Sequence, residues 1–395
     1  MGTHLKGQNA QSINHMLTDS PWNYSDLFEG IFDRAYKLLK SNKKRVYLLI
    51  DEVGFRKKGT ESACVSRQYL GCIGKSDNGQ VAVVAALNSG DFYAPVSIEL
   101  YMPKDWETDE VRRTKTKIPD WINHRTKIEM ALEVILKLYK KIKPLEYVVF
   151  DALYGSAIGF LNVLIEKKIP FVGDIKENST IYLSLPKMAI PESSGRGRKY
   201  KLPKPTKKGI SILKYQQSLK VSDYQKMEIR NGTKGILNAY YHRKKVWAMN
   251  NATKDFLEVY LLLRKNIDSS FQYALGYNPE KSSTIDMAKA QAQRVFGERV
   301  FEEGEKSVGM ADYQVRSWDG FHRHMSLCSL CLLFLMEQKL KLTHTVGKVT
   351  GYQLQELINA TILVIGTKEE IIHRLIEQIP RYQREIMKHN PKFVT

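Results

Sequence analysis

The sequence has few cysteines and no long apolar stretch, and each absence excludes a class of protein. Four cysteines among 395 residues are too few and too clustered for a disulfide framework. Cys328 and Cys331 have the spacing of half a zinc site, but no His or Cys pair completes it, so we predict buried free thiols. The longest apolar stretch, around 325–336, is too short to span a bilayer. We see no secretory leader and expect a cytoplasmic, reduced protein with no membrane partner.

Acidic residues are scarce relative to basic ones. Lys and Arg number 61 against 42 Asp and Glu, which gives a formal net charge of +19. Such an excess points to a polyanionic partner, most often nucleic acid, whereas a generally basic protein is the plainer alternative. Strand-like and helical stretches alternate along the chain, among them two strands joined by a hairpin turn at 75–79 and an amphipathic helix over 127–141. We therefore predict a mixed α/β fold.

Two aspartates follow apolar runs of the same kind. Leu48-Leu-Ile50 precedes Asp51 and Val148-Val-Phe150 precedes Asp151, and a glycine follows each aspartate within four residues. We expect Asp51 to end a buried strand, at the sheet edge where open α/β proteins place their chemistry. If the two strands are neighbours, their carboxylates lie close together. The alternative is that each aspartate caps a following helix.

A third acid could come from the predicted helix over 291–306, which carries several glutamates. Arg294 and Glu298 are four residues apart and therefore share one helical face. Taken alone, this is an ordinary solvated charged face. Three carboxylates nevertheless suit phosphoryl transfer, because two divalent ions about 4 Å apart stabilise both the attacking and the leaving oxygen. Magnesium in particular prefers oxygen ligands.

Three sequence blocks resemble bacterial insertion-sequence transposases with an Asp-Asp-Glu site. The first is Asp51-Glu-Val-Gly-Phe-Arg-Lys-Lys-Gly59, followed by a block at 66–75. The second is Val148-Val-Phe-Asp-Ala-Leu-Tyr-Gly155, and the third is Arg294-x3-Glu298 with Gly309-Met-x2-Tyr-Gln-Val-Arg-Ser-Trp318 after it. The resemblance covers about residues 15–340, with the blocks in the family's order.

The resemblance implies a ribonuclease H-like catalytic core, a mixed sheet flanked by helices, interrupted by a β-rich insertion. The composition of 177–275, rich in β-branched and aromatic residues, agrees with that insertion. We therefore divide the chain into an N-terminal helical region that could contact DNA (1–44), the first part of the core (45–176), the insertion with its basic linker (177–275), the second part of the core (276–340) and a C-terminal helical region (341–395).

The resemblance also implies the site. Asp51, Asp151 and Glu298 would be the catalytic, metal-binding triad, with two divalent ions, Mg²⁺ or Mn²⁺ in its place. Glu298 is chosen over the other glutamates because Gly309 and Tyr313 follow it at the family's spacing.

DNA contacts are expected from basic residues near the site and on the linker. Where the family usually has a lysine seven residues after the glutamate, this chain has Glu305, and a lysine follows one residue later. The expected contacts are Arg294, Arg56, Lys57, Lys58, Lys199, Lys201 and Lys306.

The function implied is a DNA transposase that cuts at the terminal inverted repeats of its element and joins the ends to target DNA, acting as a homodimer or higher oligomer on paired ends. Two alternatives are another metal-dependent nuclease or resolvase with the same fold, and a transposase-derived DNA-binding protein whose catalysis has lapsed. All three acids are present, which argues against the latter.

Overall fold

The computed structural model describes residues 10–191, 202–232, 235–280, 283–346 and 354. The chain forms two compact units, residues 1–333 and 334–395. The first unit contains the sheet and the site. No described helix is long and apolar enough to cross a membrane.

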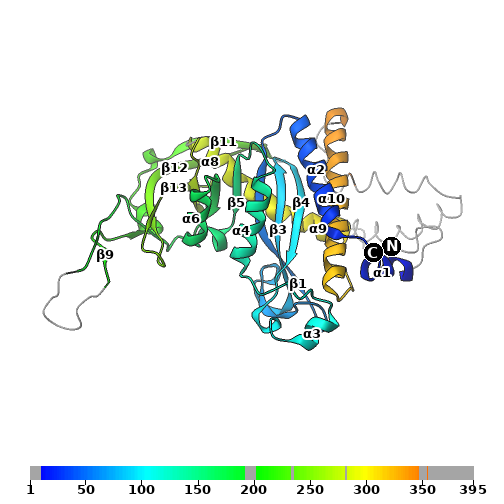
Figure 1. The fold of residues 1–395 in the computed structure, drawn as a ribbon. Coiled ribbons are helices and arrows are strands. Elements are labelled where there is room, and N and C mark those ends of the chain that lie inside the picture. Colours follow the sequence, from blue (N-terminus) through cyan, green and yellow to red (C-terminus); the bar gives the residue numbers. More distant parts are fainter. Residues whose placement is uncertain (1–9, 192–201, 233–234, 281–282, 347–353, 355–395) are drawn as a thin grey trace, which may run out of the picture. The chain divides into compact units, whose positions relative to one another are not determined.

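A ten-stranded mixed sheet is the centre of the first unit (Figure 1). The strand order is β11-β12-β13-β14-β6-β5-β1-β3-β2, and β4 also pairs with β3. β1, β5 and β6 are parallel to one another, whereas the other pairs are antiparallel. The strands are β1 (Tyr47–Arg56), β2 (Ser66–Leu70), β3 (Lys75–Ser89), β4 (Phe92–Leu100), β5 (Tyr147–Phe150), β6 (Phe171–Asp174), β11 (Gln225–Gly232), β12 (Gly235–Met249), β13 (Phe256–Lys265) and β14 (Phe271–Tyr277). The predicted mixed α/β class is confirmed.

β1 does not end at Asp51, as the sequence had suggested, but continues to Arg56. Its parallel pairing with β5 stops at Ile50, while its antiparallel pairing with β3 continues to the end of the strand. The burial pattern changes at the same point, from four fully buried residues to an alternation in which Val53 and Phe55 are buried. Beyond Asp51 the strand is covered on one face only, and alternating sequence marks such a strand. The prediction that the strand ends at Asp51 was therefore wrong.

The hairpin after β2 also differs from expectation. The polar stretch 75–79, predicted as the turn, is the first part of β3 and pairs with β2. The chain reverses earlier, in a 3₁₀ turn over Gly71–Ile73 that ends at Gly74 with φ +65°. A glycine supplies that left-handed conformation without strain.

Helices cover both faces of the sheet around β1. Glu52 pairs with Lys127 at the start of α4, whereas Asp51 lies against α9, as side chains of adjacent strand residues must point to opposite faces. The predicted helix over 127–141 is confirmed as α4, which begins at a capping box of Thr126 and Glu129. The helices are α1 (Ala10–Thr18), α2 (Tyr24–Ser41), α3 (Glu110–Lys115), α4 (Lys127–Tyr139), α5 (Ala152–Gly155), α6 (Ile158–Glu166), α7 (Ile212–Gln217), α8 (Thr284–Gln291), α9 (Val295–Val308) and α10 (Trp318–Val346).

The stretch expected as an insertion is built mostly of strands. Besides β11–β14 it contains the short strands β7 (Thr180–Ile181), β8 (Met188–Ala189), β9 (Lys204–Pro205) and β10 (Ile210–Ser211). β14 pairs antiparallel with β6, so β11–β14 extend the same sheet that carries β1 and β5 (Figure 1). The strand-rich segment therefore shares its backbone hydrogen bonding with the centre of the sheet.

Candidate active site

Three aspartates lie in a row where three neighbouring strands stop pairing in parallel. The register aligns the last paired residues of β1, β5 and β6, which are Ile50, Phe150 and Gly173. The next residue on each strand is Asp51, Asp151 or Asp174. Because adjacent strands are about 4.8 Å apart, each aspartate is one strand spacing from the next. The sheet thus brings Asp51 beside Asp151, as the sequence predicted, and adds Asp174.

Asp51 is enclosed by the strand and by α9. Its side chain is 19% exposed, and its Oδ1 accepts a hydrogen bond from the backbone N–H of Glu52 at 2.8 Å. Burial raises the pKa of Asp51 to about 6, Arg294 opposes this shift, and the nearby Asp151 adds to it. The two carboxylates are therefore close enough to repel each other, as in sites where acids share a cation.

Asp151 caps a helix while standing in this row. Its Oδ1 accepts a hydrogen bond from the N–H of Leu153 at 3.0 Å, in the first turn of α5. The capping alternative considered for the strand-end aspartates is thus correct for Asp151. The cap fixes the orientation of the carboxylate and does not compete with a role of its second oxygen.

Glu298 lies beside Arg294, in the first turn of α9. Its side chain is 69% exposed and its Oε1 lies 3.6 Å from Nη2 of Arg294, one helical turn earlier. The preceding residue, Gly297, lets the helix touch β1. A Cβ at this position would lie only 2.9 Å from Oδ2 of Asp51. At this approach of α9 to Asp51, a Cβ fits only if the Asp51 carboxylate shifts.

Arg294 connects the acids. Its Nη1 lies 3.3 Å from Oδ2 of Asp51, and its Nε donates to Oδ2 of Asp174 at 3.0 Å. The guanidinium therefore spans the row from the first strand to the third and also contacts Glu298. Burial lowers the pKa of Arg294, but the carboxylates around it outweigh this effect and raise the pKa.

The donor chemistry of the cluster suits a hard divalent ion, since every acid offers only carboxylate oxygens. In the described part of the chain, however, no three His, Cys, Asp or Glu side chains converge on one point as metal ligands would. The oxygens of Asp51 and Glu298 are turned toward the guanidinium of Arg294 instead. The residues fit a metal by their type and neighbourhood, and a cation bound between them would have to displace Arg294 from Asp51.

Two of the basic residues near Asp51 are already engaged. Nε of Arg56 lies 2.9 Å from Oδ2 of Asp77. The ammonium of Lys57 lies 3.4 Å from the ring centroid of Tyr313, and burial lowers the pKa of Lys57 to about 8. Lys58, next to it, is exposed. Of these three basic side chains, Arg56 and Lys58 are exposed, and Arg56 is engaged with Asp77.

The remaining predicted DNA contacts lie away from the row or beyond the described chain. Lys306 is on the last turn of α9 and pairs with Glu302 at 2.8 Å. Lys199 and Lys201 lie outside the described residues. None of these three shares a described contact with the aspartates.

Sequence reasoning missed Asp174 and Gln291. Phe-Val-Gly-Asp174 repeats the pattern of an apolar strand followed by an acid, so the signal was present, although no role was assigned to it. Gln291, at the end of α8, donates from Nε2 to Oδ1 of Asp174 at 3.4 Å. No spacing in the sequence indicates this contact, because it joins residues more than a hundred positions apart.

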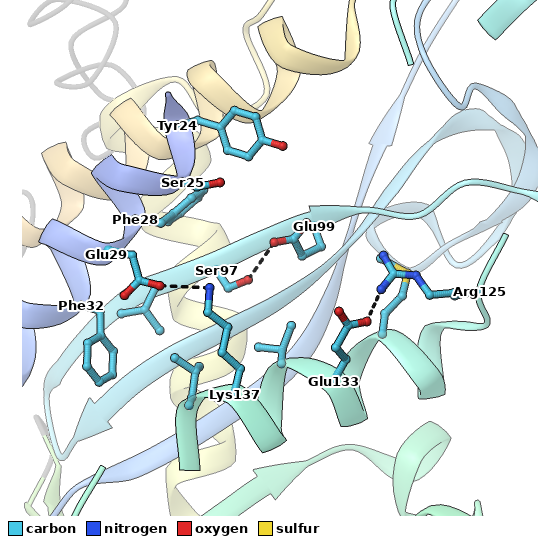
Figure 2. A pocket seen from close by; sticks show the side chains of 14 residues that line it. Tyr24, Ser25, Phe28, Glu29, Phe32, Ser97, Glu99, Arg125, Glu133 and Lys137 are labelled. Carbon is cyan, nitrogen blue, oxygen red and sulfur yellow. Dashed lines mark hydrogen bonds and ion pairs between the residues drawn. The ribbon is translucent and has the colours of Figure 1, made fainter. Parts of the chain in front are cut away.

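A separate cavity of about 170 Å³ lies between α2, β4 and α4 (Figure 2). Phe28, Phe32 and Met130 contribute to its apolar lining. The dashed lines of Figure 2 mark a hydrogen bond and ion pairs among its lining residues, such as the pair of Lys137 with Glu29 at 3.0 Å. None of the aspartates of the row lines it. The cavity is therefore distinct from the candidate site.

Fold and site together define a mixed α/β protein with an acid-lined site that is formed by the central strands of its sheet. Residues 1–236 match the family model described as DDE superfamily endonuclease, and the chain belongs to this family. The family predicted from the sequence blocks is thus confirmed. Asp51 and Asp151 lie inside the matched segment, whereas Glu298 and Arg294 lie beyond it.

One relative is the probable transposase for insertion sequence element IS701 of Microchaete diplosiphon. It is 32% identical over 183 residues, which are 46% of this chain and 44% of the relative. The match therefore spans less than half the length of that protein. Among solved structures, the NurA nuclease from Sulfolobus solfataricus aligns with 85% of this chain and 98% of its own, at 9% identity and a TM-score of 0.29. A score this low carries no argument about fold or function.

Proposed function

We propose that the protein is an insertion-sequence transposase that cuts DNA at the ends of its element and joins those ends to target DNA. The observation that supports the proposal is the register that brings Asp51 beside Asp151, where β1 and β5 stop pairing, in a chain of the DDE superfamily endonuclease family. The relative named as a probable transposase supports it.

In this proposal Asp51 and Asp151 hold divalent ions, Mg²⁺ or Mn²⁺, and Glu298 completes the set from α9. Two such ions supply an activated water and stabilise the leaving oxygen of the phosphodiester. The chain's own part is to hold the acids: β1 and β5 fix the spacing, and the cap on α5 fixes the orientation of Asp151. Burial of Asp51 excludes bulk water from one side of the site.

The bonds broken and formed are phosphodiesters of DNA. Water attacks the phosphorus at the element's end, the P–O3′ bond breaks, and the released 3′ oxygen takes up a proton as a free hydroxyl. That hydroxyl then attacks a target phosphodiester, whose own 3′ oxygen leaves. No covalent enzyme intermediate is needed, so positioning and electrostatics are the chain's contribution.

The partners are then the terminal inverted repeats and a target duplex. The formal net charge of +19 supports binding to a polyanion. We infer that the protein acts as a homodimer or higher oligomer, since two ends must be cut and joined together, and that it works in the cytoplasm, where its DNA is.

One observation favours a second candidate, a lapsed transposase that only binds DNA. Arg294 takes up the oxygens of Asp51 and Glu298 that a metal would need. If Arg294 cannot be displaced, the acids hold no ion.

The experiment that separates the candidates incubates the protein with Mg²⁺ or Mn²⁺, a labelled duplex carrying the element's own terminus, and a plasmid target. A matched duplex has the terminal repeat scrambled. A transposase nicks the natural terminus and transfers label to the plasmid. A resolvase-type nuclease cuts both duplexes without transfer, and a lapsed enzyme binds the natural terminus and cuts neither.

A further inference from the structure

Both carboxylate oxygens of Asp174 accept hydrogen bonds from side chains. Oδ2 accepts from Nε of Arg294 at 3.0 Å and Oδ1 accepts from Nε2 of Gln291 at 3.4 Å. Both donors come from the helical segment that runs from α8 to α9, across the strand ends. Asp174 thereby ties this segment to β6.

The guanidinium of Arg294 contacts acids on two sides. Its Nε faces Asp174, at the far end of the row, while its terminal nitrogens face Asp51 and Glu298. Asp51 and Asp174 are two strand spacings apart, about 10 Å between their backbones. The contact with Asp174 is the shortest of the three, so it anchors the side chain at its stem and leaves the two terminal nitrogens at longer distances.

We propose that Asp174 is a positioning residue of this site that anchors Arg294. When a divalent cation binds to Asp51, the guanidinium can then move away from Asp51 and still stay in the site. The inference rests on the proposed function and deepens it. In the described structure Arg294 supplies the positive charge beside Asp51. With a cation bound there, Asp174 is the acid that retains Arg294, within reach of a phosphate.

The anchor explains why a fourth acid stands beside the predicted triad. Burial raises the pKa of Asp174, so its charged form is costly without a partner, and the Nε–H of Arg294 together with the Gln291 amide supplies that partner. Without the carboxylate, Arg294 has only Asp51 and Glu298 to pair with. It then competes more strongly with a cation for those oxygens.

A double-mutant cycle tests this coupling without DNA or activity. Mn²⁺ affinity is measured by the loss of the free-ion electron paramagnetic resonance signal in the natural protein, Asp174→Asn, Arg294→Gln and the double variant. Salt at about 0.3 M screens the direct field of a carboxylate two strands away. Asp174→Asn is expected to weaken Mn²⁺ binding about fivefold in the natural background and less than about twofold when Arg294 is already glutamine.

Asp77 provides a matched control. It pairs with Nε of Arg56 at 2.9 Å and is 26% exposed, against 3.0 Å and 27% for the pair of Asp174 with Arg294. Asp77→Asn removes a carboxylate that also pairs with an arginine Nε but lies outside the row, so it should leave Mn²⁺ affinity unchanged. Asp174→Glu keeps the charge and should retain Mn²⁺ affinity within about twofold.

The outcomes separate the two proposals. Equal weakening by Asp174→Asn in both backgrounds, or none in either, overturns the positioning role while the natural protein still binds Mn²⁺ and cuts DNA. A natural protein that neither binds Mn²⁺ nor cuts its terminus overturns the proposed function, and the role of Asp174 falls with it.

Discussion

Helix α9 touches β1 at Gly297, and this contact gives a sharp test of the site. A Cβ here would lie 2.9 Å from Oδ2 of Asp51 and 3.8 Å from its Cβ and Cγ. The nearest atom is the end of a side chain, so Gly297→Ala moves the carboxylate and leaves the backbone in place. Alanine favours a helix over glycine by about 0.5–1 kcal/mol, which offsets part of the cost of this shift. We expect the free energy of unfolding to change by less than about 1 kcal/mol.

The catalytic consequence of that shift is much larger. A reacting group misplaced by about 1 Å can cost about a hundredfold in rate. We therefore expect Gly297→Ala to lower metal-dependent cleavage of the terminus by about a hundredfold, measured as single-turnover nicking with saturating protein. DNA affinity should stay within about threefold, because no residue predicted to contact phosphate is replaced and such contacts are many.

Gly304→Ala, on the same helix, is the matched control. Its Cβ would lie 3.0 Å from Sδ and Cε of Met310, a flexible side chain away from the acids. It introduces the same residue with a similar contact, so it should cleave like the natural protein. If Gly297→Ala also cleaved at the natural rate, or if both variants lost activity equally, the contact between α9 and Asp51 would not position the carboxylate.

Three further predictions concern charge. Lys58→Gln should weaken binding to the terminal DNA and make the affinity less dependent on salt. Lys57→Gln should have a smaller effect, because Lys57 is stacked on Tyr313 and burial lowers its pKa to about 8. A larger effect at Lys57 in a filter-binding salt titration would contradict this prediction. Burial raises the pKa of Asp51 to about 6 from 3.8, so the free energy of unfolding falls by up to about 3 kcal/mol as the pH rises through this interval. Asp51→Asn should therefore raise the melting temperature of the metal-free protein at pH 7.5 but not near pH 4. An equal rise at both pH values would show that the gain has another cause. Burial lowers the pKa of His322 to about 4 from 6.5, so the neutral imidazole stabilises the fold fully above about pH 6.5, and the free energy of unfolding falls by about 3 kcal/mol as the pH falls to 4. In urea unfolding, His322→Gln should lose less stability than the natural protein over that interval. An equal loss in both proteins would refute this role of His322.

Local sequence patterns predicted the strands that carry the first two acids. The buried runs before Asp51 and Asp151 needed no knowledge of the fold, because continuous apolar residues mark a strand covered on both faces. The helix α4 was predicted from the amphipathic spacing of its apolar residues, and the structure shows a capping box of Thr126 and Glu129 at its start.

Other features depended on pairing, which local patterns do not encode. The turn before β3 was misplaced because its left-handed glycine, Gly74, precedes the polar stretch that looked like a turn. β1 was cut short at Asp51 because its end is set by different neighbours on its two sides. Asp174 joined the site only once the register of β5 with β6 and the reach of Arg294 were known.

The central claim is that the carboxylate row performs metal-dependent chemistry on DNA, and Asp151→Asn tests it most directly. Asparagine is as good a helix cap as aspartate, so α5 should keep its first turn while the site loses a charge. Asp109→Asn, which alters the cap of α3 in the same way, is the control. With Mg²⁺ and the labelled terminus, we predict that Asp151→Asn binds the duplex but does not nick it, while Asp109→Asn nicks it at the natural rate. Equal nicking by both variants would remove Asp151 from the site and contradict the account.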